Sequence, residues 1–74
     1  MGWLYKEEID VSNTSEDRLE KHLRNQIIER MWNLPIVIKT GNVPSHRMAI
    51  HKLLDELHVS ETICRQDSIE IVRL

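Results

Sequence analysis

The chain lacks the covalent cross-links that stabilise many very small domains. Cys64 is the only cysteine among 74 residues, so no disulfide can form within the chain. Secreted domains of this size usually carry several disulfides, and we therefore expect a reducing compartment, the cytoplasm. Folding at this length removes only about 60% of the unfolded chain's surface from water. We expect a single domain spanning residues 1–74, whose stability would be increased by a partner subunit.

Long apolar runs and an excess of basic residues are also absent. No stretch approaches the roughly 18 apolar residues that a membrane span needs, so we expect no contact with a membrane. The formal net charge is −2, the acidic excess lies in the N-terminal half, and the C-terminal half is balanced. Without a basic arm to neutralise phosphates, non-specific nucleic-acid binding loses support.

An apolar repeat predicts a first helix. Apolar residues recur every four positions, at Leu19, Leu23, Ile27 and Met31. This spacing places them along one side of a helix. Residues 12–17 supply hydroxyl, amide and carboxylate groups that suit a helix start. Pro35 disfavours helical geometry at the residue before it, so the helix should end near Asn33.

A second helix is predicted after Gly41. Asn42 can cap it and Pro44 suits its first turn, and we expect it to run to about His58. Its apolar face is formed by Ile50, Leu53, Leu54 and Leu57.

The remaining segments predict strands. Residues 3–11 contain aromatic and β-branched residues, although they alternate poorly, and they predict the first strand. Residues 36–40 form a β-branched run that Gly41 ends, which is typical of a buried, central strand. Segments 63–65 and 69–72 flank turn-forming residues and are expected to pair as a hairpin.

The predicted order is βαβαββ, which favours an α+β fold with two helices packed on one face of a small mixed β-sheet. This order of elements is similar to that of the Alba chromatin proteins and of the C-terminal domain of bacterial translation initiation factor 3. Both are nucleic-acid binders, so the resemblance implies a possible nucleic-acid platform.

No catalytic pattern stands out. The serines fall in expected caps and turns, none of them lies in a nucleophile elbow, and Cys64 in a strand is typical of a small core residue. We therefore expect neither an enzyme nor a cofactor. One candidate for metal binding is the set His51, Asp55 and His58, whose directions on the second helix differ by about 60° or less. A solvated polar helix face explains the same three residues, and we prefer that interpretation.

The first helix carries more apolar residues than one side can bury. With Leu19 at zero on a helical wheel, Ile28 and Trp32 fall at about 180° and 220°. Two interpretations stay open for these two side chains. Either the N-terminal segment with Trp3 and Tyr5 covers them, or they form a subunit or partner interface to which Trp3 and Tyr5 also belong.

The main hypothesis is a small, non-enzymatic protein-interaction module. We expect a homodimer that binds and modulates or inhibits another protein, whose identity the sequence does not reveal, in the manner of small phage or bacterial regulators. The alternative is a nucleic-acid-binding regulator that uses basic residues of the C-terminal half, namely Lys39, Arg47, Lys52, Arg65 and Arg73.

Overall fold

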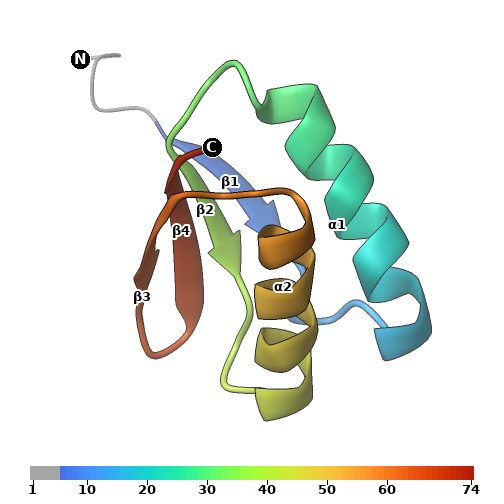
Figure 1. Cartoon of the computed structure of the whole chain (residues 1–74). Coiled ribbons are helices and arrows are strands. Elements are labelled where there is room, and N and C mark those ends of the chain that lie inside the picture. Colours follow the sequence, from blue (N-terminus) through green and yellow to red (C-terminus); the bar gives the residue numbers. More distant parts are fainter. Residues whose placement is uncertain (1–5) are drawn as a thin grey trace.

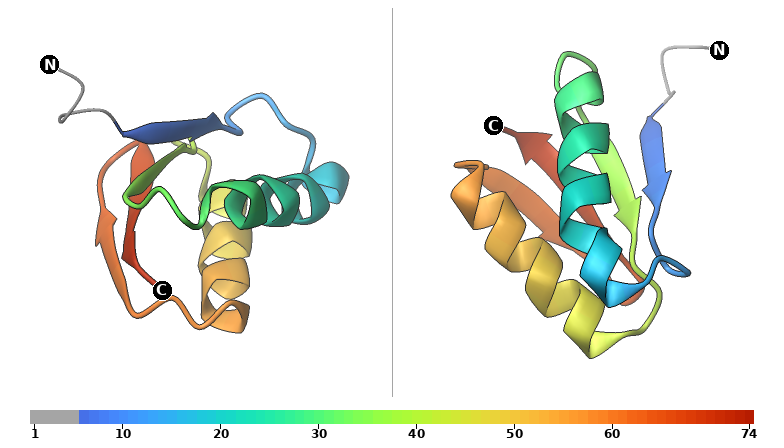
Figure 2. Two further views of the ribbon diagram at one scale, coloured as in Figure 1. Left: turned by 90° about the horizontal axis from the view of Figure 1, so that it is seen from above. Right: turned by 90° about the vertical axis from the view of Figure 1, so that its right-hand side faces the viewer.

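The computed structural model describes residues 6–74 and confirms the expected α+β fold (Figure 1). Its elements are β1 (Glu7–Asp10), α1 (Glu16–Arg30), β2 (Ile36–Lys39), α2 (Pro44–Glu56), β3 (Glu61–Cys64) and β4 (Ser68–Arg73). Both helices lie side by side on one face of the sheet, as the two views of Figure 2 show. Within the described range, neither helix is long and apolar enough to cross a membrane.

The sheet is mixed, with the strand order β1-β2-β4-β3. β1 and β2 are parallel, joined through α1, while β4 runs antiparallel to both β2 and β3. β2 is therefore central, as its β-branched run predicts, and β3 and β4 form the expected hairpin. The register places Ile9 beside Ile38 and Ile38 beside Ile69, so one row of isoleucines crosses three strands.

The core lies between this isoleucine row and the two helices. Alternate strand residues point to the same face, so one face of the sheet is apolar. Against it pack the buried side chains of the helices, which are Leu19, Leu23 and Ile27 from α1 and Ile50, Leu53 and Leu54 from α2. The apolar repeat of the first helix thus faces the core as predicted.

The first strand and first helix are both shorter than expected. β1 occupies Glu7–Asp10, and residues 3–5 of the predicted strand lie outside the described residues. α1 ends at Arg30 rather than near Asn33. The Asn33 backbone N–H donates to the Arg30 carbonyl over 2.9 Å, which makes a separate turn before Pro35.

The start of α2 differs from the prediction by one residue. Val43 is the N-cap, not Asn42, and Pro44 is the first helical residue. A residue that precedes proline is driven to extended angles, and Val43 has φ −117° and ψ 106°. Pro44 thereby fixes which residue caps the helix.

The end of α2 also falls short of the predicted position. His58 follows the helix with a left-handed φ of 59°. Its N–H donates to the Asp55 carbonyl over 3.1 Å, and the Val59 N–H donates to the Leu54 carbonyl over 3.0 Å. This pair of bonds is a Schellman motif, which closes the helix two residues before His58.

Candidate interaction surface

The two surplus apolar residues of the first helical segment are exposed. Ile28 is 51% exposed and Trp32 is 85% exposed, the largest fraction among the large hydrophobic residues described. Trp3 and Tyr5, the other expected interface residues, lie outside the described residues. The prediction that residues 3 and 5 cover or extend this surface therefore stays a prediction.

The exposure follows from how α1 lies on the sheet. The helix buries Ile27, and consecutive helical residues point about 100° apart, so Ile28 turns outward. Met31 keeps helical angles, φ −61° and ψ −18°, and Trp32 follows it in the turn after α1. We call Ile28 and Trp32 the apolar end of α1.

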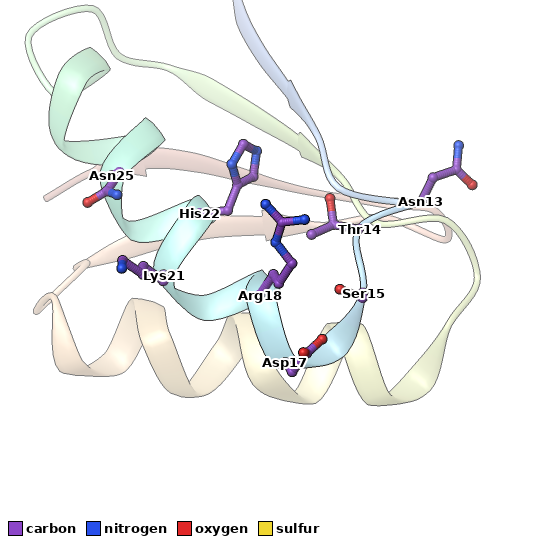
Figure 3. Close-up of a pocket in the computed structure, with 8 residues that line it drawn as sticks. All are labelled: Asn13, Thr14, Ser15, Asp17, Arg18, Lys21, His22 and Asn25. Atoms are coloured by element: carbon purple, nitrogen blue, oxygen red, sulfur yellow. The ribbon is translucent and has the colours of Figure 1, made fainter.

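A hollow of about 780 Å³ lies beside the N-terminal half of the same helix (Figure 3). Figure 3 shows Thr14 beside Arg18 and His22, with Ser15 where the loop meets the helix and the Asn13 side chain directed away from them. The lining is mainly polar and comprises Asn13, Thr14, Ser15, Asp17, Arg18, Lys21, His22 and Asn25. Sequence reasoning missed this hollow, because it depends on where the loop before α1 lies.

A buried histidine holds that loop in place. His46 in the first turn of α2 is 7% exposed, and its Nε2 lies 2.8 Å from the Thr14 carbonyl oxygen. The carbonyl can only accept, so the Nε2–H donates. The second ring nitrogen, Nδ1, is buried without a partner within the described structure. One wall of the hollow is therefore fixed by a side chain from the other helix.

Two cationic side chains that line the hollow form no ion pair within the described part of the chain. In residues 6–74, six of the ten Lys and Arg side chains form ion pairs with a carboxylate, namely Lys6, Arg24, Arg30, Lys39, Arg65 and Arg73. Arg18 and Lys21 form none in this range, although both line the hollow. Asp17 is the only carboxylate in the lining, so the hollow carries a local positive charge.

The residues of the nucleic-acid alternative are not brought together. Three of them are ion-paired within the chain: Lys39 with Glu8 at 3.4 Å, Arg65 with Glu70 at 2.8 Å, and Arg73 with Glu61 at 3.4 Å. Arg47 donates to the Thr40 hydroxyl over 3.2 Å, and Lys52 is exposed on α2. Arg47 and Lys52 lie on α2, and the other three lie on β2, on β4 and in the turn between β3 and β4, so the five groups offer no continuous basic surface.

The metal candidates do not form a site either. Because α2 ends at Glu56, His58 leaves the helix on which His51 and Asp55 lie. No cluster of three or more His, Cys, Asp or Glu side chains suited to a metal occurs in the part of the chain that the structure describes. The geometry expected for His51, Asp55 and His58 is therefore wrong, since a continuous helix to residue 58 was assumed.

Cys64 also departs from expectation. It is exposed rather than part of the core, because it ends β3, a strand at the edge of the sheet. Its Sγ lies 3.9 Å from His51 Nε2.

One carboxylate is buried on the sheet face opposite the helices. Glu70 in β4 is 4% exposed, and its neighbours are Arg65 and Lys6. Its pKa is lowered, first by the hydrogen bond from Arg65 and further by Lys6, and burial opposes the shift. This arrangement holds the edge of the hairpin to the start of β1.

Comparison with known proteins adds no family to this picture. No family model, curated protein or solved structure matches the chain.

Proposed function

We propose that this protein is a non-enzymatic, cytoplasmic protein-interaction module that forms a homodimer and acts by binding and modulating or inhibiting a partner protein. The observation that carries the proposal is the 85% exposure of Trp32 beside the half-exposed Ile28. In this position the tryptophan side chain exposes a large apolar area to water. Tryptophan is also among the residues most favoured as interface anchors.

The location of these two residues supports a shared contact. Isolated exposed apolar side chains are ordinary on protein surfaces, as Met48 on α2 illustrates at 74% exposure. Ile28 and Trp32 differ because they lie four residues apart, Ile28 in the last turn of α1 and Trp32 in the turn that follows it. A partner that covers both would remove one continuous apolar area from water.

The small size of the domain supports association for a second reason. The twelve apolar residues that are buried within residues 6–74 give a chain of this length a modest margin of stability. Binding of a second subunit to the folded form stabilises that form by mass action. A homodimer is therefore the first association that we expect.

The experiment is light scattering coupled to size-exclusion chromatography over a series of protein concentrations. The native chain should shift from monomer towards dimer as concentration rises, and Trp32→Ala should stay monomeric with a native circular dichroism spectrum. Met48→Ala is the matched control, because it removes an exposed apolar side chain of α2, and it should dimerise like the native chain. A native chain that remains monomeric throughout, or a Trp32→Ala variant that dimerises normally, would contradict the proposal.

A further inference from the structure

The exposed side of α1 and the turn after it carry a regular series of residues that joins the hollow to the apolar end. The series is Arg18, Lys21, Asn25, Ile28 and Trp32, with alternating steps of three and four residues. This spacing keeps side chains on one side of a helix, and it is the spacing of residues that meet a neighbouring helix. We call these five residues the outer stripe.

One end of the outer stripe is basic and lies beside the hollow. The other end is apolar and protrudes into solvent. Arg18 lines the hollow seven residues before Asn25, and Trp32 protrudes seven residues after it. Arg18 therefore lies about 10 Å from Asn25 along the helix axis, at 1.5 Å per residue, and Asn25 lines the near end of the hollow. Trp32 lies on the other side of Asn25, two residues after α1 ends at Arg30. A protruding side chain and a hollow on opposite sides of one midpoint are self-complementary under a two-fold rotation.

We infer that two copies pair through antiparallel α1 helices, with Asn25 at the two-fold axis and Trp32 of each copy seated in the hollow beside Arg18 of the other. This inference rests on the proposed function, because it specifies the contact that forms the homodimer. It commits the outer stripe to one occupant, the outer stripe of a second copy.

Charge complementarity favours this occupant. In the antiparallel arrangement Lys21, four residues before Asn25, faces Glu29 of the second copy, four residues after it. Lys21 forms no ion pair within the described residues, and the Glu29 side chain is 66% exposed. In residues 6–74 Glu29 has one ion-pair partner, Arg30, whose Nη1 lies 3.6 Å from Glu29 Oε2. The pair occurs twice in the dimer, once on each side of the axis.

The Arg18 end provides the second complementary contact. A guanidinium stacked on an indole ring gains a cation–π interaction, and tryptophan is the strongest partner for it. Arg18 has no carboxylate partner in residues 6–74 that would compete for this position. The hollow of about 780 Å³ is larger than an indole side chain and open to solvent, so the ring can enter it.

The two-fold arrangement also limits the size of the assembly. A protrusion and a distant hollow on one molecule can join copies in an open chain, whereas a two-fold axis uses both features of both copies at once. Two helices of this length bury a small interface, so we expect a weak, concentration-dependent dimer. Larger open assemblies in the light-scattering experiment would argue against the two-fold geometry.

A charge exchange tests the pairing of Lys21 with Glu29 of the second copy. Lys21→Glu and Glu29→Lys should each weaken dimerisation roughly threefold to thirtyfold, because each places like charges together at two sites. The double variant Lys21→Glu/Glu29→Lys should recover most of the native dimerisation constant. The two residues lie eight positions apart in one helix, about 12 Å, so recovery requires contact between copies. Lys52→Glu on α2 is the matched control and should leave dimerisation unchanged.

Disulfide trapping tests the position of the axis. In a Cys64→Ser background, Asn25→Cys should be linked between copies by mild oxidation much faster than Lys52→Cys. If dimerisation depends on Trp32 but position 25 is linked no faster than position 52, or the double charge variant does not recover, the antiparallel geometry is overturned while the proposed function stands. If dimerisation does not depend on Trp32, the proposed function fails first.

Discussion

Glu70 Oε1 accepts a hydrogen bond from Arg65 Nη1 over 2.8 Å, on the sheet face that the helices leave uncovered. Lys6 Nζ lies 3.3 Å from the other carboxylate oxygen of the same residue. The Glu70 side chain is 5% exposed, while those of Lys6 and Arg65 are about half exposed, so the two cations cover the carboxylate. A central strand thus carries a buried charge that depends on two long side chains from its surroundings.

This burial predicts a specific sensitivity to acid. The folded-state pKa of Glu70 lies below its ordinary value of 4.5, so the carboxylate contributes stability at pH values above 4.5. That contribution is lost as pH falls through the folded-state pKa. Glu70→Gln should lower the free energy of unfolding by about 1–3 kcal/mol at pH 7, with a much smaller loss at acid pH. Urea unfolding at a series of pH values measures the difference.

The control for this experiment is an exposed carboxylate of the same hairpin. Glu61 pairs with Arg73 at 3.4 Å, and its side chain is 54% exposed. Glu61→Gln should therefore change stability by less than about 1 kcal/mol at any pH. If both variants lose the same free energy of unfolding, the burial of Glu70 does not increase its contribution to stability.

Two residues with left-handed backbone angles should respond in opposite directions. Gly41 has φ 63°, and an added Cβ would lie 3.3 Å from the Ser12 Cβ, so Gly41→Ala should destabilise the fold by about 1 kcal/mol or more. His58 has φ 59° with a full side chain, so His58→Gly should be neutral or stabilising by up to about 1 kcal/mol. Thermal unfolding of both variants measures the two changes. A lower stability of His58→Gly than of the native chain would contradict the strain argument.

The hydrogen bond between His46 and Thr14 should matter for both stability and association. His46→Leu keeps apolar volume but leaves the Thr14 carbonyl without its donor, which should lower the free energy of unfolding by about 1–3 kcal/mol. His46→Gln retains an N–H donor and should cost less. Because Thr14 lines the hollow, dimerisation should weaken in the same order, measured by light scattering at a temperature where both variants are folded.

Local signals in the sequence were sufficient to predict the order and type of the helices and strands. The four-residue apolar repeat, the β-branched run before Gly41 and the turn between the last two strands each act over a few neighbouring residues. The positions of the helix ends were less accurate. Pro44 makes the residue before it, Val43, the N-cap of α2. The Schellman motif at His58 ends α2 earlier than predicted, and no glycine marks that position in the sequence.

Features that join distant segments could not be predicted. The burial of Glu70 requires Lys6, which lies 64 positions away in the chain, and a carboxylate in a strand otherwise suggests a solvated face. The hollow requires the bond between His46 and Thr14, which are 32 positions apart. The exposure of Ile28 and Trp32, in contrast, follows from helical geometry once Leu19 and Ile27 are assigned to the core.

The place of β4 in the sheet has a consequence for how the chain folds as it is made. Residues 68–73 are translated after both helices and the other three strands, yet they lie between β2 and β3. Until they emerge from the ribosome, the apolar edge of β2 has no antiparallel neighbour and the isoleucine row is incomplete. Nascent chains that stop before Ser68 should therefore remain protease-sensitive and bind chaperones, and protection should begin abruptly once β4 is released.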